Sequence, residues 1–283
     1  MTRPRSSTRP YRRPPPDCSF VASPSALTVC VWLCVVAAGC GPKRISLPAD
    51  PGTPLADFAR IHDEVSKECR AVDTLTANLR LSVRAGSESF RGTVISAFRR
   101  PDSMQLRMTA AFTTVFVLVA NDGGATLLLN RDRRVVRDAR ADEILDALVG
   151  IKVTPADLQA MITGCVVPEP RATGGRQHGS GWVSIDLDGG ATLYLQRARD
   201  VWRVRAARQG DWVIEYPAWQ AGSRFPPQMW ISTSGSVPVD LRAAIDDVEI
   251  NVKLTDADFT VPIRDEAPMT LEELRESGPL RSR

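Results

Sequence analysis

The chain has 283 residues, of which 43% are hydrophobic and 24% charged, and its formal net charge is +3. The first 39 residues hold five arginines and one acid out of the chain's 36 basic and 33 acidic side chains, so residues 40–283 carry a net charge of −1. The basic character therefore belongs to the start of the chain, and we expect no nucleic-acid partner. The remainder is long enough for one sizeable domain or two small ones.

Residues 1–39 have the layout of a secretory signal peptide. An arginine-rich start precedes an apolar run of about 14 residues that ends at Gly39, whereas a membrane-spanning helix needs roughly 20. The run leads through small residues, Ala37-Ala38-Gly39, into Cys40. This resembles the lipobox of bacterial lipoproteins, in which the leader is cleaved and the cysteine receives diacylglycerol and palmitate. Cys40 is the predicted lipidation site, and a membrane-spanning anchor is the alternative that the short run disfavours.

The segment after Cys40 is rich in proline and glycine, which predicts a tether over residues 40–54. A helix is expected next, because apolar residues recur at spacings of three and four. These residues are Leu55, Phe58, Ile61, Val65, Cys69 and Val72.

The pattern then changes to a period of two, which is typical of strands. We expect strands over 79–84, 104–109, 115–119 and 127–129, with a hairpin turn at 121–124. Two short helices should follow. The first ends at Gly150, and the second begins at Thr154-Pro155 and ends at Gly164.

A glycine-rich loop, 172–181, separates these helices from a second group of strands. The expected strands are 182–187, 192–195, 201–206, 212–216, 229–232 and 239–254. Near the end, Thr270 and Glu273 have the spacing of a capping box and predict a brief terminal helix.

Two cysteines, Cys69 and Cys165, remain after those of the leader and Cys40 are set aside. In an oxidising compartment they could form a disulfide. Two buried thiols are the alternative, because the sequence does not give the distance between their Cα atoms.

The sequence gives little support for catalysis or metal binding. Its two histidines, His62 and His178, have no partner at metal-ligand spacing, and no nucleophile, phosphate or dinucleotide motif is present. We therefore expect no enzyme, no metal and no cofactor other than the covalent lipid on Cys40. Convergence of His178 with an acidic side chain in a cleft would favour an enzyme.

Three stretches resemble the outer-membrane lipoprotein-sorting family that contains LolA and the lipoprotein receptor LolB. They are "DSMQLRMTAAFTTVFVLVANDGGATLLLN" (102–130), "ADEILDALVGIKVTPADLQAMITG" (141–164) and "DWVIEYPAWQAGSRFPPQMWIS" (211–232). The resemblance extends over roughly residues 54–262. It implies an α+β fold in which helices cover the concave face of a strongly curved antiparallel sheet, an open half-barrel of about 10–11 strands. The expected parts are a cleaved signal peptide (1–39), a lipid-anchored tether (40–54), a LolB-like domain (55–262) and a charged tail with a short helix (263–283).

The resemblance also implies a function. The protein would be a lipid-anchored receptor or carrier at the outer membrane, facing the periplasm, because Gly41 rather than an aspartate follows Cys40. Its partners would be acylated lipoproteins, a LolA-like carrier and outer-membrane lipid, and we expect a monomer. The alternative is a structural or adaptor lipoprotein that has the same fold with a packed core and no lipid cargo.

Site residues follow from the same resemblance. Phe112 corresponds to the exposed apolar tip of a family loop that inserts into the membrane, and ordinary core packing is the alternative explanation for this residue. Matched alternation predicts that the acyl-chain cavity is lined by Leu106, Met108, Val115, Val117, Leu145, Leu148, Leu158, Ile162, Trp212, Ile214, Met229 and Ile231. The same pattern would arise from an ordinary core.

Overall fold

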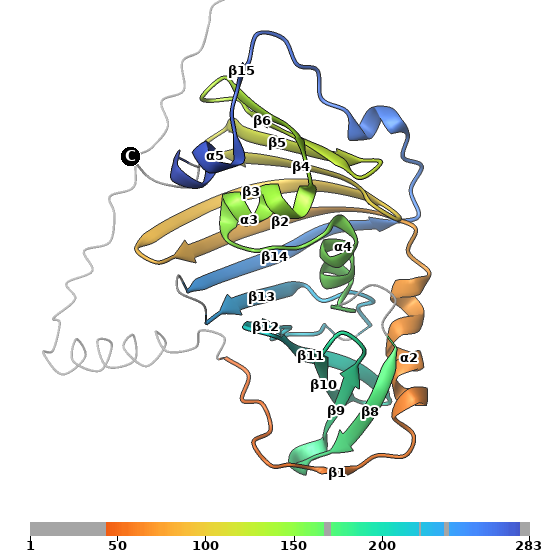
Figure 1. Cartoon of the computed structure of the whole chain (residues 1–283). Coiled ribbons are helices and arrows are strands. Elements are labelled where there is room, and N and C mark those ends of the chain that lie inside the picture. Colours follow the sequence, from red (N-terminus) through yellow and green to blue (C-terminus); the bar gives the residue numbers. More distant parts are fainter. Residues whose placement is uncertain (1–43, 167–170, 221, 235–237, 278–283) are drawn as a thin grey trace, which may run out of the picture. The chain divides into compact units, whose positions relative to one another are not determined.

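One large open sheet organises the protein. A computed structural model describes residues 44–277 except 167–170, 221 and 235–237 (Figure 1). The signal peptide and Cys40 therefore lie outside the described residues. Within them the strand order is β1-β8-β9-β10-β11-β12-β13-β14-β2-β3-β4-β5-β6-β7-β15, and every neighbouring pair is antiparallel except β15 with β7. The expected α+β class and the open, mostly antiparallel sheet are confirmed.

The strands fall into two groups along the chain. Those of the first half are β1 (Thr53–Pro54), β2 (Thr74–Ala85), β3 (Glu88–Arg99), β4 (Ser103–Ala110), β5 (Thr113–Asn121), β6 (Gly124–Leu129) and β7 (Arg134–Ala139). Those of the second half are β8 (Ala172–Gln177), β9 (Trp182–Leu187), β10 (Ala191–Ala198), β11 (Val201–Gln209), β12 (Trp212–Glu215), β13 (Gln228–Thr233), β14 (Val239–Ile250) and β15 (Ala267–Pro268). The long strand β14 joins the halves, since it pairs with β13 on one side and β2 on the other.

The described sheet has 15 strands, more than the ten or eleven expected. The additional ones are β1, β3, β7, β8 and β15, and β3 is the longest of them. Gly92 makes β3 hard to recognise, because a glycine inside a strand pattern resembles a turn. A Cβ added at Gly92 would lie 2.7 Å from the carbonyl oxygen of Thr109, so the close approach of β4 requires glycine here.

The helices are α2 (Phe58–Arg70), α3 (Ala141–Val149), α4 (Pro155–Thr163) and α5 (Leu271–Ser277). Their caps follow the predicted signals. Thr154 and Asp157 form a capping box at the start of α4, and Gly150 and Gly164 end α3 and α4 with φ values of 71° and 85°. Two short 3-10 turns, Gly179–Gly181 and Asp256–Phe259, complete the described elements.

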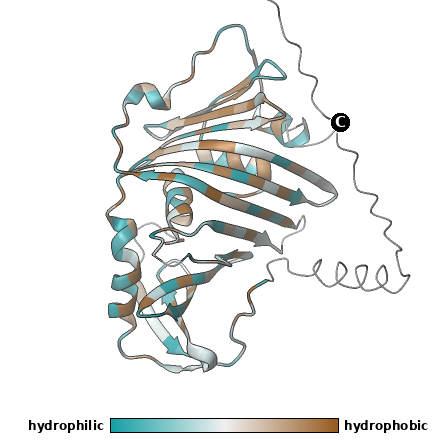
Figure 2. Ribbon diagram, turned by 180° about the vertical axis from the view of Figure 1, so that it is seen from behind, coloured by the Kyte–Doolittle hydropathy of each residue, from teal (hydrophilic) through white to brown (hydrophobic). Residues whose placement is uncertain are grey.

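The core lies between the sheet and the helices. Figure 1 shows α3 and α4 in front of β14, β2 and β3, and Figure 2 shows apolar and polar residues alternating along the long strands. On most strands one face is apolar and belongs to the main core, while the other face, which we call the outer face, is mostly polar. No helix among the described residues is long and apolar enough to cross a membrane.

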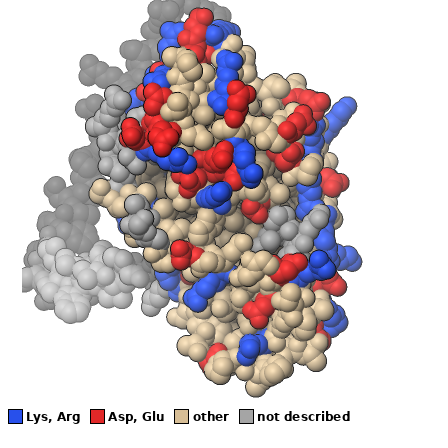
Figure 3. Space-filling model, viewed as in Figure 1, with Lys and Arg blue, Asp and Glu red and all other residues tan. Residues whose placement is uncertain are grey.

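The C-terminal segment packs against the rest of the molecule. Leu274 of α5 is fully buried in the main core, and Arg275 forms an ion pair of 3.5 Å with Asp146 of α3. Figure 3 shows charged side chains gathered over α3 and α5, so the outward side of these helices is polar.

Candidate functional site

An apolar cavity of about 90 Å³ lies between the sheet and helices α3 and α4. Its lining residues come from six strands, from both helices and from the link between the helices. They are Leu79, Leu81, Val83, Phe90, Val94, Phe98, Leu106, Met108, Phe116, Leu145, Leu148, Val149, Ile151, Val153, Leu158, Ile162, Met229, Ile231 and Leu241. Every one of these side chains is apolar, so the cavity offers no polar partner to a ligand and suits a hydrocarbon.

Eight of the predicted lining residues are in this cavity. They are Leu106, Met108, Leu145, Leu148, Leu158, Ile162, Met229 and Ile231. The sequence reasoning missed the contribution of β2 and β3, although the alternation of Leu79, Leu81 and Val83 was a usable signal.

Val115 and Val117 do not line the cavity. A bulge shifts the register of β4 and β5, since Met108 pairs with Phe116 but Thr109 pairs with Thr114, which leaves Val115 as the extra residue. Phe116 therefore points into the cavity, and Val117 packs on the outer face with Leu128 and Val261. The strand is apolar on both faces, so its sequence could not reveal which residues point inward.

Trp212 and Ile214 also lie outside the lining. Both pack against the main core, but their strand, β12, is beyond the edge of the cavity, which ends at β13. Alternation predicted their face correctly; it could not predict where the helices stop covering the sheet.

The mouth of the cavity is marked by the lining residues that are partly exposed. These are Leu81, Phe90, Val149 and Leu158, whereas Val94, Phe98 and Ile162 are buried. Leu81 and Phe90 belong to the part of β2 and β3 near the turn that joins these two strands. We call this end of the strands the turn end.

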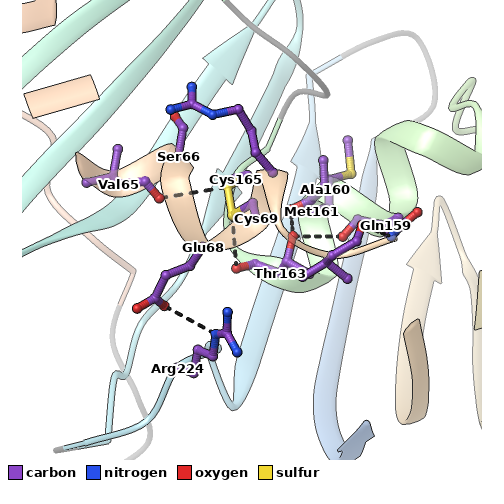
Figure 4. Close-up of a disulfide and its surroundings, with 12 residues drawn as sticks. Val65, Ser66, Glu68, Cys69, Gln159, Ala160, Met161, Thr163, Cys165 and Arg224 are labelled. Carbon is purple, nitrogen blue, oxygen red and sulfur yellow. Dashed lines mark hydrogen bonds and ion pairs between the residues drawn. A yellow bond between two sulfur atoms is a disulfide. The ribbon is translucent and has the colours of Figure 1, made fainter. Parts of the chain in front are cut away.

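Helix α4 is fastened to the sheet and to α2. Cys69 of α2 and Cys165, just after α4, form a disulfide with their Cα atoms 6.2 Å apart (Figure 4). Gln159 donates a 3.0 Å hydrogen bond to the carbonyl of Val72, and the buried hydroxyl of Tyr216 donates one of 2.8 Å to the carbonyl of Met161. These bonds hold α4 in place, so any widening of the cavity falls to α3 and the link between the helices.

Phe112 is fully exposed at the two-residue turn between β4 and β5. Ala111 and Phe112 both have positive φ, 47° and 65°, which is the geometry of a tight hairpin turn and is unfavourable for a bulky residue. Core packing, the alternative explanation for Phe112, is therefore wrong. A large apolar side chain is thus held fully exposed in a strained turn, where it is available for a contact outside the molecule.

Neither histidine lines the cavity. His62 is buried in α2, where its Nε2 is 3.2 Å from the hydroxyl of Ser66. His178 does meet an acid: its Nδ1 is 3.0 Å from a carboxylate oxygen of Asp50, and its Nε2 is 2.8 Å from the hydroxyl of Ser184. Ser184 is buried in β9 and none of the three residues lines the cavity. We interpret these bonds as fastening the segment before β1 to the β8–β9 hairpin.

The sheet is open, and short helices cover an apolar cavity on one of its faces. Proteins of this class are suited to holding hydrophobic chains. The family model of the outer membrane lipoprotein LolB matches residues 74–253, which is more than half of the chain. This chain therefore belongs to the LolB family. No curated protein matches its sequence.

The structure is similar to several solved structures at low identity. A DUF1329 family protein from Desulfovibrio piger aligns with a TM-score of 0.50 and 10% identity, over 74% of this chain and 98% of that one. A LolA superfamily protein from Nitrosomonas europaea gives 0.47 and 9%, over 74% and 98%. An outer membrane lipoprotein-sorting protein domain from Vibrio parahaemolyticus gives 0.47 and 10%, over 71% and 95%.

Proposed function

We propose that this protein is a lipid-anchored receptor or carrier that binds the acyl chains of lipoproteins and helps to place them in the outer membrane. Membership of the LolB family and the wholly apolar lining of the cavity support the proposal. In this role the sheet is a half-barrel, α3 and α4 cover its concave face, Cys40 carries the anchor and the protein faces the periplasm. Cargo would arrive from a LolA-like carrier.

The energetics of acyl binding agree with this role. Each CH₂ group removed from water contributes about 0.8 kcal/mol, so burial of about a dozen gives roughly 10 kcal/mol before the costs of binding. No catalytic group is required, because differences in affinity between carrier, receptor and bilayer set the direction of transfer.

The cavity volume means that a carrier would need a lid that moves. About 90 Å³ is more than a filled core would leave, but it is below the several hundred Å³ of typical ligand pockets. A complete acyl chain therefore needs α3 to move away from the sheet. An adaptor with a packed core is the second candidate, and the small volume is the observation that favours it.

The test is transfer of cargo to residues 41–283, which lack the lipid site. We expect this protein to take up an acylated lipoprotein from a LolA-like carrier and to retain lipid that mass spectrometry detects. A non-acylated form of the same cargo is the control, and it should not be transferred. Absence of both uptake and bound lipid would exclude the carrier and leave the adaptor.

A further inference from the structure

The segment before β1 is bound to the folded unit rather than free. We call residues 44–54 the strap. At its start, Arg44 forms ion pairs with Glu215 at 2.5 Å and with Asp240 at 3.1 Å, and the backbone N–H of Ile45 donates to Glu215 at 2.6 Å. Glu215 is only 3% exposed, so Arg44 neutralises a buried carboxylate that would otherwise be costly.

The other end of the strap is held independently. Asp50 bonds to His178, and Thr53–Pro54 pairs with β8. Fixed at both ends, the strap leaves its first residue, Arg44, on the outer face near the start of β14.

This position limits where an anchor on Cys40 can enter a membrane. Arg44 is four residues from Cys40, and four extended residues span at most about 14 Å. An anchor on Cys40 would therefore enter the bilayer on the side of the molecule where Arg44 meets Asp240, at the turn end of β14 and β2.

Basic side chains gather at the same place. In the strand register, Asp240 of β14 lies opposite Arg84 of β2. Arg242 of β14 and Arg91 of β3 lie on either side of the same β2 residue, Ser82. Adjacent strands are about 4.8 Å apart, so these residues form one patch on the outer face. Arg84 and Arg91 are exposed, and within the described part of the chain neither has an ion-pair partner. We call Arg44, Arg84, Arg91 and Arg242 the basic end.

The exposed apolar tip lies beside this patch. Thr93 of β3 pairs with Thr109 of β4, so continuing the register places Arg91 opposite the turn that carries Phe112. The mouth of the cavity is at the same end, at Leu81 and Phe90. The turn end of the strands therefore carries four features: Arg44 next to the proposed anchor, the exposed arginines Arg84 and Arg91, the apolar tip Phe112 and the cavity mouth.

We propose that the basic end binds the anionic phospholipid headgroups of the bilayer that holds the protein's own anchor. The inference rests on the proposed lipid anchor at Cys40. Arginine suits this partner because its planar guanidinium binds phosphate oxygens in pairs, and an arginine near an anionic membrane strengthens binding about fivefold. Bound in this way, the protein holds Phe112 and the cavity mouth against the membrane.

The experiment measures binding to vesicles without the anchor. Residues 43–283 form one compact unit that contains the described core, so they can be studied apart from the residues before them. We expect this unit to co-sediment with vesicles of phosphatidylglycerol and phosphatidylcholine more strongly than with phosphatidylcholine alone, and less strongly in high salt. The double variant Arg84→Glu/Arg91→Glu should bind the anionic vesicles at least about thirtyfold more weakly.

The matched control is Arg199→Glu/Lys253→Glu, which makes the same change in charge. These two exposed residues follow β10 and β14, at the opposite end of the strands, and should leave vesicle binding within about twofold of wild type. Equal affinities of the two double variants, or no preference of the wild type for anionic vesicles, would overturn the proposal. The proposal would also be overturned if Arg84→Glu/Arg91→Glu bound vesicles normally but accepted cargo poorly from an acidic carrier protein. The basic end would then bind a protein and not a membrane.

Fatty-acid uptake by the same samples separates this proposal from the function. If fatty-acid uptake fails in every variant while vesicle affinities differ as expected, the acyl-binding role is wrong and headgroup binding by the basic end is supported. If uptake is normal in all while vesicle affinities are equal, only the basic end is wrong.

Discussion

At the scale of single residues, Phe112 is the side chain whose surroundings differ most from those of an ordinary core residue. It is fully exposed in a turn that disfavours it, beside the mouth of an apolar cavity. Its position suggests that it contributes to the last step of transfer, the entry of cargo into a bilayer, and not to the capture of cargo.

Replacement of Phe112 by Glu should therefore separate the two steps. We expect cargo uptake to be unchanged and delivery to liposomes to fall, because a carboxylate cannot enter the hydrocarbon region. Ile95→Glu is the matched control, since Ile95 is an exposed apolar residue on the outer face, 49% exposed, and not at the turn. Normal delivery by Phe112→Glu would show that the tip has no part in insertion.

His62 gives the fold a dependence on pH. Burial lowers the pKa of His62; the carboxylates of Asp63 and Asp188 oppose this effect, and Arg70 adds to it. In the unfolded chain histidine has a pKa of about 6.5, so below that pH the unfolded state binds more protons than the folded state. The free energy of unfolding should therefore fall as the pH falls below about 6.5, by at most about 1.4 kcal/mol per pH unit.

Urea unfolding of wild type and His62→Gln at pH 7, 6 and 5 tests this. Gln is neutral throughout, so the variant should lose less stability over this range, whatever its stability at pH 7. Parallel pH profiles of the two proteins would mean that His62 does not titrate differently on unfolding.

At the scale of elements, the two helices over the cavity differ in freedom. The disulfide and the hydrogen bonds of Gln159 and Tyr216 fasten α4, whereas α3 is held by an exposed ion pair with α5 and is followed by Gly150 and a short link. Val149 and Leu158, which flank this link in the chain, are partly exposed at the mouth, so this is where an acyl chain would pass.

A larger side chain at Leu158 should obstruct that passage. We expect Leu158→Trp to weaken binding of a fluorescent fatty acid about tenfold or more, because each CH₂ kept out of the cavity loses about 0.8 kcal/mol. Val201→Trp, at an exposed valine outside the cavity lining, should bind like wild type. Full affinity of Leu158→Trp would place the bound chain somewhere other than this cavity.

The sequence predicted these elements unequally. The caps Thr154, Gly150 and Gly164 depend on local chemistry, and the structure confirms them. The strand β3 was not predicted, because it contains Gly92. A glycine is needed there for the close approach of β4, which is visible only in the structure. Val115 and Val117 were assigned to the cavity for a related reason, since neither the bulge nor the covering of the outer face by Val261 leaves a local signal.

At the scale of the whole molecule, the two ends of the described chain are part of the folded unit. The sequence predicted a tether and a charged tail, because both segments are polar and rich in proline or acidic residues. Their contacts are with residues distant in the chain: Arg44 with Glu215, and Leu274 with the main core. Reasoning from local pattern does not reach such contacts.

Leu274 tests the packing of α5. Its side chain is fully buried, so Leu274→Ala should lower the free energy of unfolding by about 2–4 kcal/mol. The neighbouring exposed Glu272→Ala should change it by less than about 0.5 kcal/mol. Urea unfolding measures both, and equal stabilities would show that α5 does not pack against α3 in solution.

The two-residue strands β1 and β15 have a consequence for solubility. A sheet that does not close leaves two edges whose free N–H and C=O groups can pair with another molecule and start aggregation. Here β1 pairs along β8 at one edge, and β15 pairs along β7 at the other. The strap and the C-terminal segment thus cover edges at which copies of the protein could associate, so trimming either end should yield a protein that precipitates.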